Sequence, residues 1–169
     1  MSLSMYTLTI PTMLRGFGVL GTYVERAAGH ARATNLDPSV LMQARLAPDM
    51  LPFIGQIQRA SDKSKNGISR LTGVEAPSFP DTEVTFDDLQ ARIAKSVHFL
   101  QSLNEKSFEG SDSKTIEIKF RSINGVFTGE QYLMNVLLPD FFFHVATAHD
   151  ILRNQGLPLG KADYLGRLN

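Results

Sequence analysis

The 169-residue sequence contains no cysteine. This absence excludes a disulfide scaffold, thiolate metal ligands and a cysteine nucleophile. An excess of one sign of charge is also absent, because 17 lysine and arginine residues balance 17 aspartate and glutamate residues. We therefore expect no nucleic-acid partner, since binding to phosphates requires a basic surface.

Long hydrophobic runs are missing as well. Apolar stretches such as Val136–Leu138 and Phe141–Phe143 are far shorter than the ~20 residues of a membrane-spanning helix. No charged region precedes the first apolar stretch, so we expect no secretory signal and no membrane partner. The length is that of one domain, and we expect residues 1–169 to form a single cytoplasmic domain.

Helical periodicity dominates the rest of the sequence. In four long segments, apolar side chains recur at steps of three and four residues, as they do along one face of an α-helix. These segments are residues 13–31, 53–71, 86–103 and 129–154. Asp37 and Pro38 are typical of an N-cap and a first helical position, and they predict a short helix through about Arg45. Thr85 and Asp88 have the spacing of a capping box.

A short β-hairpin is expected before the last helix. Residues 115–120 alternate apolar and polar side chains, and residues 126–128 are expected to pair with them across a tight turn at Asn124-Gly125. Pro139 is expected to kink the last helix, and the tail after Gly156 is too polar and glycine-rich for a helix of its own. Four helices joined by short connections predict an all-α fold, an antiparallel four-helix bundle.

His144 is the first candidate for a functional residue, because it lies on the apolar face of the last predicted helix. Two interpretations remain open: a core histidine that bonds a carbonyl or hydroxyl group, or a ligand or general base that titrates near neutral pH. His149 cannot easily share a metal ion with His144, since ligand pairs on one helix face are three or four residues apart. Position 148, which has the right spacing, holds alanine.

A polar band on the predicted helix 53–71 offers further candidates. Gln58, Asp62 and Asn66 recur at steps of four residues, and Lys65 lies beside them. The band is either the solvated face of an amphipathic helix, or Asp62 and Lys65 meet His144 across the bundle in a polar pocket. The sequence leaves both interpretations open.

Three consecutive phenylalanines, Phe141–Phe143, point in three directions on a helix, so at least one must leave the core. An exposed phenylalanine on so apolar a helix predicts a homodimer contact. The alternative is packing beneath the C-terminal tail.

Several segments resemble a family known only as a domain of unknown function. They include LAPDMLPFIGQIQRASDKSKNGISRLTG, FPDTEVTFDDLQARI and LPDFFFHVATAHDILRNQG, and the resemblance spans nearly the whole chain. That family is placed in the DinB/YfiT-like superfamily of four-helix bundles. The resemblance implies dimers, thiol-dependent transferase or hydrolase activity in some members, and a nickel or zinc ion held by three histidines. One histidine comes from the second long helix and two come from the fourth, in H-x-x-x-H spacing.

Carried over to this chain, the resemblance gives a degenerate metal site. His144 is similar to the first histidine of the pair, whereas the partner position is Ala148. The position on the second long helix falls near Asp62, whose carboxylate could bind zinc or nickel. A third ligand could come from the tail, at Asp163 or Tyr164.

Three functional hypotheses follow. The one we favour is a dimeric, cofactor-free protein, either small-molecule binding or stress-associated, with a pocket near His144. The second is a metal-dependent transferase or hydrolase that uses nickel or zinc on His144 and Asp62. The third is a metal-free acid/base enzyme in which His144 is the base and Asp62 or Asp140 orients it. Asp140 precedes His144 by four residues, which places both on one helix face.

Overall fold

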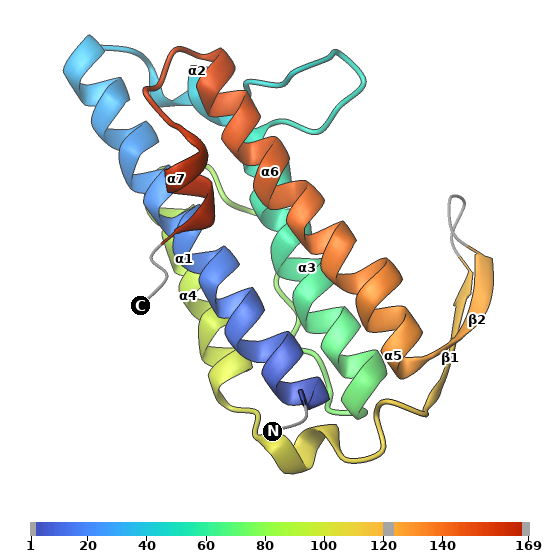
Figure 1. Ribbon diagram of the computed structural model, residues 1–169. Coiled ribbons are helices and arrows are strands. Elements are labelled where there is room, and N and C mark those ends of the chain that lie inside the picture. Colours follow the sequence, from blue (N-terminus) through green and yellow to red (C-terminus); the bar gives the residue numbers. More distant parts are fainter. Residues whose placement is uncertain (1–2, 120–123, 167–169) are drawn as a thin grey trace.

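The computed structural model of the protein describes residues 3–119 and 124–166. It is a helical bundle with a β-hairpin before the last long helix, as predicted (Figure 1). The four long helices are α1 (Met5–Thr34), α3 (Phe53–Thr72), α4 (Phe86–Gln101) and α6 (Leu138–Asn154). Helix α1 contacts α4 and α6, and α3 contacts the same two helices, so α1 and α3 lie diagonally opposite.

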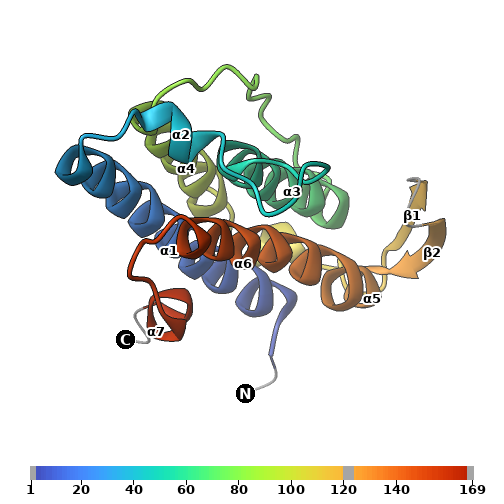
Figure 2. The same ribbon diagram turned by 90° about the horizontal axis from the view of Figure 1, so that it is seen from above.

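The order of side-chain contacts gives the directions of the helices. Phe17 of α1 packs against Phe141 of α6. Further along α1, Tyr23 bonds His149, which lies further along α6. Helices α1 and α6 are therefore parallel, and Figures 1 and 2 show that α3 and α4 run together in the opposite direction.

The parallel arrangement of α3 and α4 requires a long connection. A 20-residue helix such as α3 is about 30 Å long at 1.5 Å per residue. The chain must return over that distance before α4 begins. Residues 73–85 make this crossover, and an extended segment of that length can span ~40 Å. This crossover differs from the short connections expected between all the helices.

Side-chain caps define several helix starts. Helix α1 begins earlier than the apolar pattern indicated, because Ser4 Oγ accepts the N–H of Thr7 and caps it. Asp37 caps the short helix α2 (Pro38–Met42), which ends before the predicted limit at Arg45. The predicted capping box of Thr85 and Asp88 is present at the start of α4.

The last helical segment is not one continuous α-helix. It begins as α5 (Gly129–Tyr132), widens into the π-helical segment η2 (Leu133–Leu137) and continues as α6. The wide turn directly precedes Pro139, which has no N–H to donate to the preceding turn. The Leu138 N–H donates to the carbonyl of Leu133, five residues back, as in a π-helix. The predicted kink is therefore a change of helix type.

The hairpin consists of strands β1 (Thr115–Lys119) and β2 (Asn124–Thr128), which pair antiparallel. The prediction of a turn at Asn124-Gly125 was wrong, because both residues belong to β2 and pair with Lys119 and Ile118. Phe120, predicted at the end of the first strand, lies outside the described residues. Figure 1 shows the hairpin projecting from one end of the bundle.

The C-terminal tail forms a helix, which corrects the expectation that it would not. Helix α7 (Lys161–Leu165) lies along α1 (Figure 2). Arg26 of α1 forms an ion pair with Asp163 at 2.8 Å. Arg15 of α1 donates to the carbonyl of Leu165 at 3.0 Å. Docking to α1 therefore stabilises a helix that is too short to be stable alone.

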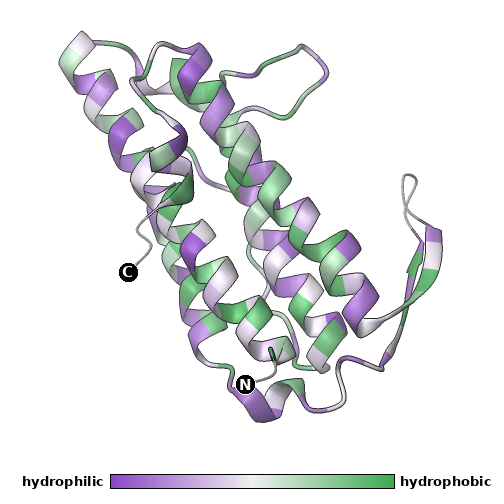
Figure 3. Cartoon of the chain, in the orientation of Figure 1, coloured by the Kyte–Doolittle hydropathy of each residue, from purple (hydrophilic) through white to green (hydrophobic). Residues whose placement is uncertain are grey.

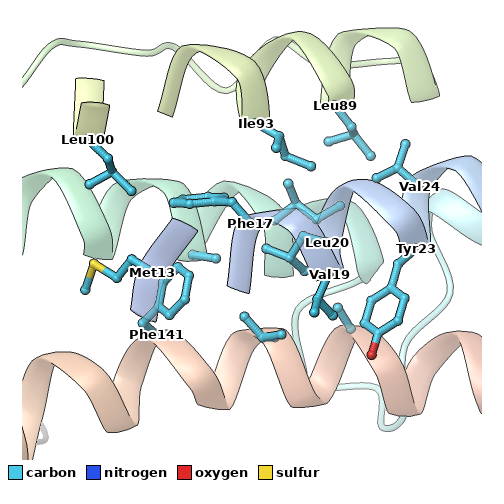
Figure 4. Packing of buried hydrophobic residues seen from close by; sticks show 14 of the residues in the cluster. Met13, Phe17, Val19, Leu20, Tyr23, Val24, Leu89, Ile93, Leu100 and Phe141 are labelled. Atoms are coloured by element: carbon cyan, nitrogen blue, oxygen red, sulfur yellow. The ribbon is translucent and has the colours of Figure 1, made fainter. Parts of the chain in front are cut away.

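The apolar faces of the four long helices meet in one core. In Figure 4, Phe17 and Leu20 of α1 lie between α4 and α6, with Ile93 on one side and Phe141 on the other. Figure 3 shows polar and apolar residues interleaved along each long helix, as in amphipathic helices. Of the helices in the described part of the chain, none is both long and apolar enough to cross a membrane.

Gly129 is expected to be essential for the junction between the hairpin and α5. A Cβ at this position would overlap the backbone carbonyl oxygen of Ser111. We expect Gly129→Ala to lower the free energy of unfolding by ~1–3 kcal/mol, measured by chemical denaturation. The matched control is Gly18→Ala in α1, where an added Cβ meets no atom within 4 Å. The control should be neutral or stabilising by up to ~1 kcal/mol, and equal effects of the two substitutions would contradict this interpretation.

Candidate functional site

His144 of α6 is buried and faces α3, where it contacts Gln56. Its Nδ1 lies 2.8 Å from Oε1 of Gln56. The amide nitrogen of Gln56 donates to the carbonyl of Leu51 at 2.9 Å, so its oxygen is the atom turned toward the histidine. His144 Nδ1 is therefore the donor; Nε2 keeps a lone pair in the neutral ring and carries the proton that Asp140 accepts when the ring is an imidazolium. This is the tautomer that a general base at Nε2 needs.

The other side of the His144 ring faces Asp140. Nε2 lies 3.5 Å from one carboxylate oxygen of Asp140, and Nζ of Lys63 lies 2.7 Å from the other. Burial raises the pKa of Asp140, but the hydrogen bonds with His144 and Lys63 outweigh it and hold the pKa below the ordinary value. Asp140 is therefore ionised near neutral pH.

Asp62 belongs to a different group of side chains. One carboxylate oxygen lies 3.1 Å from Lys65 Nζ and 3.0 Å from Arg92, and the other lies 3.1 Å from Arg59. Within the described residues, no hydrogen bond or ion pair joins Asp62 to His144. Lys65 lies beside the ring of Phe79, 5.3 Å from its centroid. The structure thus brings Asp62 and Lys65 together, while His144 is paired with Gln56 and Asp140.

Arg92, which the sequence analysis missed, is the centre of this second group. It is buried on α4 and bonds Asp62 of α3 together with Asp81 and Glu83 of the crossover. Burial raises the pKa of Glu83, but hydrogen bonds from Arg92 and Gln58 outweigh it and lower the pKa. The sequence did carry a signal for Arg92, because this arginine falls on the apolar face of the predicted helix 86–103.

A cleft of about 500 Å³ lies beside both groups, between α3 and the α5–α6 segment. Five side chains of α3 line one wall: Arg59, Asp62, Lys63, Asn66 and Arg70. The opposite wall is largely apolar and consists of Ile118, Tyr132, Val136, Leu137, Pro139 and Phe143. Asp140 connects the cleft to His144. The cleft therefore combines charged and apolar surfaces.

The three phenylalanines do point in three directions. Phe141 is buried in the core. The guanidinium carbon of Arg15 lies over the ring of Phe142, 5.2 Å from the ring centroid. Phe143 is 57% exposed and lines the cleft. The exposed phenylalanine expected from the sequence is thus Phe143.

The chain is similar to known proteins over nearly its whole length. Residues 5–165 match the family described as Domain of unknown function (DUF1993). The chain belongs to this family. A crystal structure of a DinB family member protein from Shewanella denitrificans is 33% identical to it, with a TM-score of 0.90 over 96% of this chain and 92% of that chain. No curated protein matches the chain. These findings confirm the DinB-like bundle predicted for this DUF1993 protein.

The side chains around His144 do not fit the metal ion that the superfamily resemblance implies. On α3, the residue opposite His144 is the amide Gln56, six positions before Asp62. Ala148 is buried and offers no donor atom. Residues 3–119 and 124–166 contain no group of three histidine, aspartate or glutamate side chains that could hold a metal. The hypothesis that His144 and Asp62 share an ion stays a prediction that this geometry does not favour.

The tail residues considered as third ligands lie elsewhere. Asp163 is paired with Arg26, and the ring of Tyr164 lies against His149, 6.4 Å between centroids. His149 in turn bonds the Tyr23 hydroxyl at 2.8 Å. Burial raises the pKa of Tyr23, so its hydroxyl stays protonated while it shares this hydrogen bond with Nδ1 of His149. These groups form a separate cluster between α1, α6 and α7.

Metal content tests this assignment. We expect protein purified without an affinity tag to contain no stoichiometric nickel or zinc by elemental analysis, before and after incubation with either metal. The positive control is Gln56→His with Ala148→His, which supplies three histidines and should bind zinc. About one ion per wild-type chain that is lost in His144→Ala would contradict the expectation.

The lowered pKa of Asp140 predicts a pH-dependent contribution to stability. A group whose pKa is depressed by folding stabilises the fold above its unfolded pKa of ~4 and loses that contribution as the pH falls through the lower folded pKa. We expect Asp140→Asn to cost ~1–2 kcal/mol of unfolding free energy at pH 7 and less at pH 3. The matched control is Asp150→Asn, an exposed position on the same helix. An Asp140→Asn cost that is unchanged at pH 3 would rule out the ionic contribution.

Proposed function

We propose that this protein binds a small organic molecule in the α3–α6 cleft and needs no metal ion to do so. One observation carries the proposal: the cleft combines charged side chains of α3 with the exposed ring of Phe143. Its volume of about 500 Å³ falls in the range typical of small-molecule sites, ~300–1,000 Å³. The π-helical segment η2 supports it further, because Val136 and Leu137 of that segment line the cleft and such segments are frequent at functional sites.

A metal-free acid/base reaction is the second candidate. It is favoured by the contacts of His144, whose Nδ1 donates to Gln56 while Nε2 faces Asp140. In this arrangement Gln56 fixes the ring, and Nε2 could take up a proton from a molecule in the cleft by way of Asp140, which lines the cleft. Binding without conversion in the wild type would favour the first candidate, and conversion that His144→Asn abolishes would favour the second. A metal-dependent transferase or hydrolase is the least favoured, because the described residues hold no group of three side chains that could bind the ion.

The proposal also retains a homodimer, a cytoplasmic location and a link to stress. The support for a dimer is the exposure of two large apolar side chains, Phe143 at 57% and Met134 at 48%. Phe143 also lines the cleft, so a ligand and a second chain would compete for its ring.

Filling the cleft should abolish ligand binding. Asn66 lies on an exposed part of the α3 wall, where a tryptophan would occupy the space available to a ligand. We expect metabolites that raise the unfolding temperature of the wild type to have no effect on Asn66→Trp.

The matched control is Gln101→Trp, an exposed position on α4 that does not line the cleft. This variant should respond to the same compounds as the wild type. Responses that survive in Asn66→Trp, or a metabolite library that gives none in the wild type, would count against the cleft as a binding site.

A further inference from the structure

We infer that the cleft recognises a small organic carboxylate with an apolar body, an inference that rests on the proposed function. The cleft is divided into two chemically different walls. Helix α3 supplies cationic donors, and the α5–α6 segment together with the hairpin supplies apolar contacts. A ligand that satisfies both walls carries an anionic head and a hydrocarbon part.

The cationic wall follows from the spacing of three residues on α3. Arg59, Lys63 and Arg70 are separated by four and seven residues, so they lie along one face of the helix. All three line the cleft, whereas among the described residues two carboxylates do so, Asp62 and Asp140. Cationic side chains therefore outnumber anionic ones around the space that a ligand would occupy.

The two carboxylates already accept several charged donors. Asp62 pairs with Arg59, but it also pairs with Lys65 and Arg92, which do not line the cleft. Its negative charge is therefore shared with cations outside the ligand space. Asp140 pairs with Lys63 on one oxygen and faces His144 with the other. A cationic ligand would have to displace these internal partners.

Arg59 retains donor capacity for an anion. Its ion pairs with Asp62 and Asp81 both use the same nitrogen, Nη2. A guanidinium has five N–H donors in a planar fork, and the arrangement suits the two oxygens of a carboxylate. Arg70, the other arginine of this wall, lies close enough to the Tyr132 hydroxyl to lower its pKa, against a larger increase caused by burial. It brings a second guanidinium to the same cleft.

The apolar wall of the cleft favours a ligand whose uncharged part is hydrocarbon. Phe143, Val136 and Ile118 line the side of the cleft across from α3. Phe143 remains 57% exposed in the folded chain, so a ligand that covered its ring would remove apolar surface from water. An inorganic anion would use only the α3 wall and leave this surface exposed.

Three probes of similar size separate charge from shape: phenylacetate, phenylacetamide and phenethylamine. We expect phenylacetate to bind with millimolar or better affinity at pH 7 by isothermal titration calorimetry. It should shift the side-chain amide signals of Asn66 in NMR spectra. Phenylacetamide should bind at least about tenfold more weakly, and phenethylammonium should bind more weakly still. Acetate tests the apolar wall and should also bind at least about tenfold more weakly than phenylacetate.

Two arginine variants locate the anion. Arg59→Gln and Arg70→Gln should each weaken phenylacetate binding by about tenfold while leaving phenylacetamide binding unchanged. The matched control is Arg32→Gln, an exposed arginine on α1 outside the cleft, which should bind phenylacetate as the wild type does. Arg59 also forms an ion pair with Asp81, so the Arg59→Gln result is used only if this variant unfolds at the same temperature as the wild type. The Arg70→Gln variant and the comparison of the three probes do not depend on that condition.

The outcomes separate this inference from the proposed function. Equal affinity for the acid, the amide and the amine, tighter binding of the amine, or no binding of phenylacetate would overturn carboxylate recognition. The proposed function would survive any of these results if metabolites still stabilised the wild type but not Asn66→Trp. Phenylacetate binding that persists in Asn66→Trp would place the anion outside the cleft and overturn the inference as well.

Discussion

A buried arginine organises the side of the bundle that carries the cleft. Arg92 of α4 is buried in the bundle. Burying an unpaired guanidinium costs a large free energy, so this side chain requires carboxylate partners. Asp62 of α3 forms an ion pair with it, as do Asp81 and Glu83 of the crossover. This cluster holds the long connection against both helices. Of the three guanidinium nitrogens of Arg92, Nε has no hydrogen-bond partner in the described residues.

The same cluster determines which charges reach the cleft. Asp62 is turned toward Arg92 and Lys65, so it cannot act as an independent carboxylate beside His144. Arg59 is held between Asp62 and Asp81 at the edge of the cleft. A structural ion cluster thus leaves the ligand space with a surplus of cationic side chains. Arg59 and Asp62 of α3 therefore belong both to the ion cluster and to the wall of the cleft.

Around His144, an amide makes the contact on α3 where the resemblance implied a histidine ligand. Gln56 accepts from Nδ1 and is itself fixed by the carbonyl of Leu51, so these hydrogen bonds hold the ring in one orientation. Nε2 remains directed at Asp140 and, through it, at the cleft. The protein therefore has the DinB-like bundle, and hydrogen bonds and an ion pair join the polar side chains around His144.

The sequence by itself determined the helices, because their apolar periodicity and their caps are local properties: the capping box of Thr85 and Asp88 and the cap at Asp37 were both visible in it. It also singled out His144 and its neighbour Asp140, which are joined by helical spacing alone. Only the tertiary structure decided that α3 and α4 are parallel, that Gln56 and not Asp62 faces His144, and that the tail folds into α7. Each of these depends on which surfaces meet across the bundle, and periodicity along one helix carries no information about its neighbours.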